Sequence, residues 1–264
     1  MGSLMNAKRV VFKVGTSTLA YRGGGINLRR VEKLVRVLSD LKNQGKDIVL
    51  VSSGAIGVGM GKLGLRERPR ESRFKQALAA IGQCELMDYY SELFAGYNHN
   101  VAQLLLTKDI MDDETRRNNA IATFETLFEY GVIPIVNEND SVSTEQIEFG
   151  DNDTLSAHVA KLIGAQMLII LSDIDGLYDG NPNNTFAQLI SKVDDINDDI
   201  RSVAGGAGSA NGTGGMITKI AAAEIFTRTG GDMFILNGNS PDIIYDLLDG
   251  EKVGTFFKGR NNGD

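Results

Sequence analysis

Short apolar runs alternate with longer segments of helical periodicity along almost the whole chain. The runs at 48–51 and 167–171 carry only apolar residues, and a helical pattern covers 72–95. Strands that are apolar on both faces are typical of a parallel sheet with helices on each side. The alternation therefore predicts an α/β fold, a three-layer sandwich with a mostly parallel central sheet.

The expected elements follow from this pattern. Strands are expected at Arg9–Val14, Asp47–Val51, Val101–Leu106, Val132–Val136, Met167–Leu171 and Met233–Leu236, and helices at 28–44, 72–95, 113–130, Asp153–Ile163 and Met216–Arg228. Asn27 can cap the first helix and Gly45 can end it. In such sheets ligands bind beyond the carboxyl ends of the strands, so the loops that follow the strands should carry the function.

No low-complexity segment divides the chain. We therefore expect a single domain over 1–264 with an N-terminal lobe at about 6–160 and a C-terminal lobe at about 161–264. Residues 1–4 look like a cloning remnant and are left out of this expectation.

Composition narrows the function classes. A net charge of −7 and a pI near 5.0 argue against nucleic-acid partners and an anionic membrane surface, since phosphates would be repelled. The single cysteine, Cys84, allows no internal disulfide and is expected to be a buried free thiol in a helix. With no apolar run of transmembrane length and no signal peptide, we expect a cytoplasmic protein.

Two loops combine glycine with lysine. Lys13 ends the first expected strand and precedes Gly15, and the glycine-rich segment 212–215 opens the helix that contains Lys219. A lone lysine at a strand end is usually a solvated cation, and a glycine-rich loop alone can simply be flexible. Together they can bind a phosphate, because glycine exposes backbone N–H donors and the start of a helix favours anions.

The densest polar cluster is Asn137–Asp140 followed by 150–154. One of Asp151 or Asp153 can cap the next helix, but capping does not explain so many carboxylates and amides in one connection. Carboxylates this close repel unless a lysine, a metal or an ammonium-bearing ligand lies among them. Ser172 and Asp173, after the next strand, are suited to the sugar or base of a nucleotide.

Other glycines have simpler explanations. Ser53 and Gly54 follow the second strand, where backbone amides can approach an anion. The spacing at 59–64 fits a dinucleotide-binding pattern, but it lies too far after the strand and lacks the acidic residue expected downstream. A P-loop is excluded because Leu63 follows Lys62. We interpret these later glycines as turn and packing residues.

Five segments resemble the glutamate 5-kinases, a branch of the amino acid kinase family, and they follow the same order along nearly the whole chain. They are 11–17, 52–56, Asn137–Asp140, 150–153 and 212–219. The pair Asn-Glu-Asn-Asp and Gly-Asp-Asn-Asp is the most specific part. The resemblance implies transfer of the γ-phosphoryl group of ATP, with Mg²⁺, to the γ-carboxylate of L-glutamate, giving L-glutamyl 5-phosphate, the first step of proline biosynthesis.

The resemblance also implies roles for individual residues. Catalysis would involve Lys13 on the ATP phosphates, Lys219 on the transferring phosphoryl group, and Asp153 orienting both lysines. Glutamate would be held in the N-terminal lobe by Ser53, Asp140 and Asn152. In the C-terminal lobe, ATP would be bound by Lys13, Ser172, Asp173, Thr213, Gly214, Gly215, Met216, Ile217, Thr218 and Lys219. Ser172 stands where the family has threonine, which keeps the hydroxyl group.

The chemistry needs no general base, because a γ-carboxylate with a pKa of about 4.3 is already ionised at neutral pH. The main obstacle is the repulsion between two anions, about 4 kcal/mol for unit charges ~4 Å apart at an effective dielectric constant of about 20. Mg²⁺ is expected to be held mainly by phosphates and water, so no metal-binding residues are named.

Alternatives and further implications stay open. The chain could phosphorylate N-acetylglutamate or aspartate, or be a non-catalytic sensor of ATP and an amino acid. The resemblance also implies proline as a possible feedback inhibitor and a homo-oligomer, a dimer or tetramer. Many relatives carry a further C-terminal domain of RNA-modification type, and we expect the function of that domain to be missing.

Overall fold

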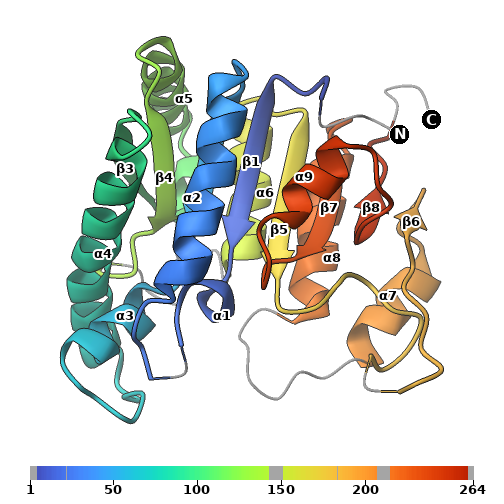
Figure 1. Cartoon of the computed structure of the whole chain (residues 1–264), viewed down its shortest axis with the longest axis horizontal. Helices are drawn as coiled ribbons and strands as arrows, with labels where there is room; N and C mark the ends of the chain where they lie inside the picture. Colours follow the sequence, from blue (N-terminus) through green and yellow to red (C-terminus); the bar gives the residue numbers. More distant parts are fainter. Residues whose placement is uncertain (1–4, 22, 143–150, 183, 207–214, 261–264) are drawn as a thin grey trace.

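A computed structural model describes residues 5–21, 23–142, 151–182, 184–206 and 215–260. These residues form a central sheet with helices on both faces (Figure 1). The strands lie in the order β3-β4-β2-β1-β5-β7-β8-β6, and every pairing is parallel except that of β7 with β8. The prediction of a three-layer α/β fold with a mostly parallel sheet is confirmed.

The strands are β1 (Arg9–Val14), β2 (Asp47–Ser52), β3 (Val101–Leu106), β4 (Ile133–Glu138), β5 (Met167–Ser172), β6 (Lys192–Val193), β7 (Asp232–Asn237) and β8 (Thr255–Phe257). The α-helices are α1 (Thr16–Leu19), α2 (Leu28–Asn43), α3 (Ala55–Lys62), α4 (Ser72–Ala95), α5 (Glu114–Glu129), α6 (Asn152–Leu162), α7 (Asp198–Gly206), α8 (Met216–Thr227) and α9 (Ile243–Leu248), and a 3₁₀ turn, η1, spans Lys108–Met111.

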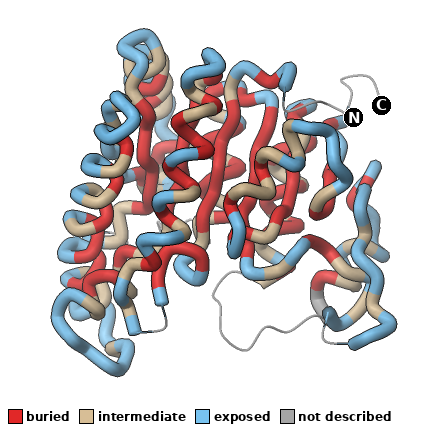
Figure 2. The backbone as a smooth tube through the Cα atoms, in the orientation of Figure 1, coloured by how far each residue is buried: buried red, intermediate tan, exposed pale blue. Residues whose placement is uncertain are grey.

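Two apolar cores lie on opposite faces of the sheet. Along β1, Phe12 faces the core that includes α2 and α4, and Val11 faces the core that includes α5, α6 and α8. This follows from the alternation of side chains along a strand. The tube in Figure 2 is accordingly buried along the strands and exposed on the outer sides of the helices.

Local sequence signals set several helix ends. The side chain of Asn27 accepts a hydrogen bond from the backbone of Arg30, and Gly45, just after α2, has a φ of 85°. Asp151 caps α6 by accepting from the backbone N–H of Thr154 at 2.9 Å. The predicted roles of Asn27 and Gly45 are confirmed, and of the two candidate caps the structure selects Asp151.

A helix that the sequence did not lead us to expect, α3, contains the glycines at 57–61. A Cβ on Gly59 would lie 2.1 Å from the Leu78 carbonyl oxygen, and one on Gly61 would lie 2.4 Å from that of Gly24. Gly64 has a φ of 67°, which suits a turn. The interpretation of these residues as packing and turn glycines is confirmed. The short elements α7, α9, β6 and β8 were also not foreseen.

The prediction that Cys84 is buried is wrong. Cys84 is exposed, because the buried stripe of α4 passes through Leu78, Gln83, Leu86 and Tyr90 and leaves position 84 outside it. No helix within the described part of the chain has the length and apolar character that crossing a membrane would need.

The order of the strands marks where a ligand can bind. After β1 the chain places β2, β3 and β4 on one side, with β4 between β2 and the outer strand β3, and then crosses to β5 and β7 on the other side. A crevice opens at such a switch point, outside the carboxyl ends of the strands. Lys13, Ser52, Asn137 and Ser172 all lie at or next to these ends.

Candidate active site

Lys13 lies near the end of β1 and is almost fully buried. It shares a sheet face with Val11, so its side chain lies on the side of α6 and α8. Its Nζ is 2.6 Å from Oδ1 of Asp153. A buried lysine needs such a partner, because an unpaired charge in the protein interior is costly.

Asp153 lies in the first turn of α6 and is 0% exposed. Its second oxygen, Oδ2, accepts a hydrogen bond from Nζ of Lys219 at 3.1 Å and another from Oγ1 of Thr218 at 2.8 Å. Burial alone would raise the pKa of Asp153. The ammonium groups of Lys13 and Lys219 and the hydrogen bonds outweigh burial, so the pKa lies below its ordinary value.

The two lysines, far apart in the sequence, therefore meet on the two oxygens of one carboxylate. Among these three ionised groups, positive charge exceeds negative charge by one. Lys219 lies in the first turn of α8, where the backbone amides of the helix start also favour an anion. This end of the sheet is suited to a phosphate group.

A chain of amides lies on the other side of β1. Nδ2 of Asn152 donates to Oγ of Ser53 at 2.9 Å and to Oδ1 of Asn137 at 2.8 Å. Nδ2 of Asn137 donates in turn to Oε1 of Gln83 at 2.9 Å. The structure thus brings Ser53, predicted after β2, and Asn152, predicted before α6, into direct contact.

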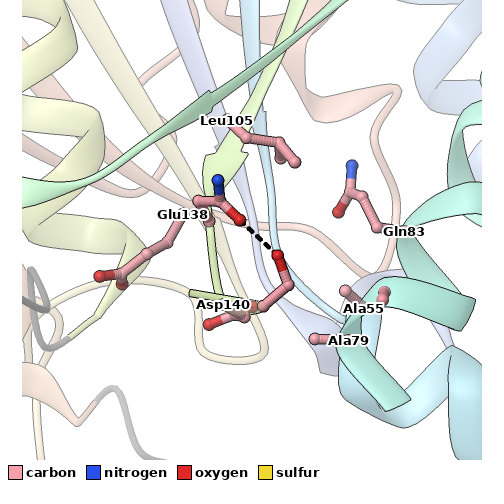
Figure 3. Close-up of a pocket in the computed structure, with 9 residues that line it drawn as sticks. Ala55, Ala79, Gln83, Leu105, Glu138 and Asp140 are labelled. Carbon is pink, nitrogen blue, oxygen red and sulfur yellow. Dashed lines mark hydrogen bonds between the residues drawn. The ribbon is translucent and has the colours of Figure 1, made fainter. Parts of the chain in front are cut away.

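A pocket lies beside this chain (Figure 3). It is lined by Ala55, Ala79, Ala80, Gln83, Leu105, Glu138, Asn139, Asp140 and Ser141. Gln83 from α4 and Asp140 from the loop after β4 lie on opposite sides, and the Glu138 side chain points away from Gln83. Small side chains at Ala55 and Ala79 leave room for a short aliphatic chain between polar groups.

Consecutive residues of α6 join the two parts of the site. Asn152 contacts Ser53 and Asn137 beside the pocket, and Asp153 contacts Lys13 and Lys219. The first turn of α6 thus connects the lysine pair, through Asn137, to Gln83 on the pocket wall, although Asn152 and Ser53 do not themselves line the pocket. This arrangement can hold two reactants next to each other.

The remaining predicted residues lie on the β5 side. Ser172 ends β5 and pairs with Asn237 at the end of β7, and its hydroxyl donates to Asp173 at 3.3 Å. Gly215, Met216, Ile217 and Thr218 form the start of α8. Thr213 and Gly214 lie outside the described residues.

Three features of the site were not foreseen: the role of Gln83, the contact of Asn137 with it, and the hydrogen bond from Thr218 to Asp153. Gln83 comes from the middle of a helix, whereas the glycine and polar motifs of the sequence point to loops after strands. A signal was present, because Gln83 interrupts a stripe of apolar residues on α4. A polar residue in such a stripe must find a partner when buried.

Comparisons with a family profile and with curated proteins match the same family. The Amino acid kinase family profile matches residues 8–237. The chain is 54% identical over 260 residues to a glutamate 5-kinase of Clostridium perfringens, covering 97% of each chain. It is 51% identical over 258 residues to a glutamate 5-kinase of Lactiplantibacillus plantarum, covering 96% of this chain and 97% of that one.

Solved structures share the fold at low identity. A carbamate kinase from Giardia lamblia bound to AMP-PNP has a TM-score of 0.66 at 19% identity, covering 97% of this chain and 100% of that chain. A UMP kinase from Bacillus anthracis has a TM-score of 0.64 at 16% identity, covering 97% of each. From the family match and the curated relatives together, the chain belongs to the glutamate 5-kinases of the amino acid kinase family.

Proposed function

We propose that this protein transfers the γ-phosphoryl group of ATP to the γ-carboxylate of L-glutamate, forming L-glutamyl 5-phosphate, the first step of proline biosynthesis. The observation that carries the proposal is the pair of lysines on Asp153, joined through Asn152 to an acidic and amide-lined pocket. Relatives named glutamate 5-kinase, more than half identical over nearly the whole chain, support the same activity.

ATP binds on the side of β5 and α8 in this proposal. Lys13 and Lys219 contact phosphate oxygens, and the backbone amides from Thr213 to Lys219 line the phosphates. Ser172 and Asp173 contact the nucleoside. The carbamate kinase of the same fold, which binds AMP-PNP, supports a nucleotide as the ligand.

Glutamate occupies the pocket beside α3 and α4. Asp140 suits the ammonium group, and the hydroxyl of Ser53 suits a carboxylate, because carboxylates accept hydrogen bonds. Nδ2 of Asn152 is already bonded within the protein, so Asn152 offers its oxygen, which suits the ammonium group. Ala55 and Ala79 leave space for the two methylene groups between the charged ends.

In the reaction, an oxygen of the γ-carboxylate attacks the γ-phosphorus. A bond forms between that oxygen and phosphorus, the bond from phosphorus to the bridging oxygen of ADP breaks, and ADP leaves with the electron pair. No proton needs to move. Lys13 and Lys219 reduce the repulsion between the two anions and hold them in line. Asp153 keeps both ammonium groups in place.

Mg²⁺ would accompany the nucleotide. Within the described residues, no group of three or more His, Cys, Asp or Glu side chains is placed to hold a metal ion. In this proposal the ion binds phosphate oxygens and keeps several waters, as Mg²⁺ commonly does. When bound, the ion would neutralise phosphate charge.

Other parts of the proposal rest on family resemblance. They are a homo-oligomer, a dimer or tetramer, and feedback inhibition by proline. The cytoplasmic location is a proposal from the sequence pattern and not from the resemblance. Phosphorylation of N-acetylglutamate or aspartate is not favoured, since the curated relatives are named for glutamate. A sensor without catalysis would need affinity alone and not two lysines on one carboxylate.

Incubation with ATP, Mg²⁺, glutamate and hydroxylamine tests the proposal. The acyl phosphate reacts with hydroxylamine, so the γ-hydroxamate and ADP should form in equal amounts. N-acetylglutamate and aspartate in parallel reactions should give far less. Faster turnover of either one, or ADP release without hydroxamate, would exclude glutamate phosphorylation as the main activity.

A further inference from the structure

Helix α4 directs two buried polar side chains at the ends of neighbouring strands. Gln83 bonds to Asn137 in β4, and the Tyr90 hydroxyl lies 2.8 Å from Oγ of Ser52 at the end of β2. The two residues lie on one face of the helix, since seven residues are about two turns. Either could be apolar if packing were their only role, because burying a polar group costs free energy.

A backbone group fixes which atom each amide presents. The N–H of Glu138 donates to Oδ1 of Asn137 at 2.9 Å. A backbone N–H cannot accept, so the Asn137 atom facing it must be the oxygen. Nδ2 of Asn137 therefore points to Gln83, and Gln83 must present its oxygen, Oε1.

The same reasoning orients the next amide. The atom of Asn152 that faces Oδ1 of Asn137 must be its nitrogen. That nitrogen also lies 3.3 Å from the Ser52 carbonyl oxygen, which can only accept. Oδ1 of Asn152 is thereby turned away from Asn137, on the opposite side of its amide group.

Close packing of α3 against α4 places Gln83 beside the pocket. The residue before it, Gly82, touches α3, and a Cβ there would lie 1.8 Å from the Ala55 carbonyl oxygen. Gln83 is 7% exposed and lines the pocket together with Ala55 and Asp140.

We propose that Gln83 is a positioning residue for the acceptor amino acid. Its Oε1 holds the Asn137 amide, and through it the Asn152 amide, in the single orientation in which Asn152 presents an oxygen to the acceptor. This proposal rests on the proposed function, because it takes glutamate as the molecule that Asn152 contacts.

The first test is the variant Gln83→Met, which keeps the length of the side chain but removes the accepting oxygen. The Michaelis constant for glutamate should rise on the order of tenfold, because Nδ2 of Asn137 loses its buried acceptor and the Asn137 amide is then held through its oxygen alone. The constant for ATP should stay within about twofold. Cys84→Ser, on the exposed side of the same turn, is the matched control and should match the wild type. If Gln83→Met does not fold, judged by its thermal unfolding, Gln83→Ala replaces it.

A double-mutant cycle with Asn152→Ala separates positioning from general packing. If Gln83 acts through Asn152, introducing Gln83→Met into the Asn152→Ala variant should raise the Michaelis constant for glutamate by less than about twofold, because the effects of coupled residues are not additive. The positioning role of Gln83 would be overturned if the two substitutions raised the Michaelis constant for glutamate by the product of their separate effects. It would also be overturned if this constant were unchanged in a folded Gln83→Met variant. Absence of hydroxamate from the wild type in the same assay would instead reject the proposed function, and this proposal with it.

Discussion

At the scale of single residues, Asp153 organises the charged part of the site. It is completely buried and has a lysine on each oxygen. The sequence singled out Lys13 and Lys219 because each lies beside glycines near a strand or helix end, and the role of Asp153 came from the family resemblance. Their contact with one carboxylate could not be predicted from periodicity, since it depends on how β1, α6 and α8 pack.

Replacing Lys219 tests its proposed role on the transferring phosphoryl group. Lys219→Met should lower kcat by about 100- to 1,000-fold, because charge stabilisation in the transition state is lost. The Michaelis constant for glutamate should change little. Lys161→Met, on the exposed side of α6, is the control for a removed ammonium group. A normal kcat with only a raised glutamate constant would assign Lys219 to binding.

Replacing Asp153 tests the charge balance. Asp153→Asn leaves two ammonium groups close together without the carboxylate, so the free energy of unfolding at pH 7 should fall by about 3–5 kcal/mol. Chemical denaturation with a fluorescence readout measures this. A loss below about 1 kcal/mol would mean that the carboxylate does not balance the two lysines.

The same pair of proteins gives a pH test. The pKa of Asp153 in the folded state lies below its ordinary value of 3.8, so its carboxylate stabilises the fold fully above that pH. As the pH falls below 3.8 and through the lowered folded pKa, the wild type should lose this advantage over Asp153→Asn. Denaturation curves between about pH 6 and about pH 2 should therefore converge at the acid end. A constant difference across this range would contradict the lowered pKa.

At the scale of elements, the contact between α3 and α4 shapes the pocket that Gln83 and Asp140 line. Gly59 and Gly82 let the helix backbones approach closely, and Ala55 and Gln83 beside them line the pocket. Glycine has a low helix propensity, so the sequence alone predicted turns and packing here but no helix. Packing against α4 stabilises the helix α3, which the low helix propensity of its own residues does not favour.

Substituting Gly82 tests this contact. In Gly82→Ala the added methyl group must push α3 and α4 apart, since it would overlap the Ala55 carbonyl oxygen. The free energy of unfolding should fall by about 1–3 kcal/mol, and the Michaelis constant for glutamate should rise.

Gly180→Ala is the control for this substitution. A Cβ at Gly180 would meet no other atom within 4 Å, so the free energy of unfolding should change by less than about 0.5 kcal/mol. Equal stability of both alanine variants would show that the helix contact at Gly82 tolerates a side chain.

At the scale of the whole molecule, the strands and long helices could be predicted because their apolar patterns are continuous. The order of the strands and the helix α3 could not, since both depend on contacts between distant segments. The residues around the pocket show the same division. Ser53, Asp140 and Asn152 lie in sequence motifs that carry the family resemblance and were predicted through it, whereas Gln83 lies mid-helix and is recognised only from its bond to Asn137.

The edge of the sheet opposite the site holds a different charged group. Arg9, at the start of β1, pairs with Glu125 at 2.7 Å and with Asp47 at 3.5 Å, and its guanidinium lies 4.3 Å from the centre of the Phe128 ring. These contacts join β1, β2 and α5 at the opposite end of β1 from Lys13.

Arg9→Met should therefore separate stability from activity. The free energy of unfolding should fall by about 2 kcal/mol, with kcat and both Michaelis constants unchanged. Arg73→Met, at a largely exposed arginine, is the control and should change stability by less than about 0.5 kcal/mol. A drop in kcat for Arg9→Met would mean that this edge of the sheet influences the chemistry.

The burial of Asp153 has a consequence for how the substrates arrive. Its carboxylate cannot turn outward without breaking contacts to β1 and α8, so the ammonium groups bonded to it can move only a short distance. In the proposed reaction, the γ-phosphorus of the nucleotide and the carboxylate oxygen of the amino acid would therefore have to meet at a point fixed by the protein, and most of the movement in a catalytic cycle would fall to the ligands.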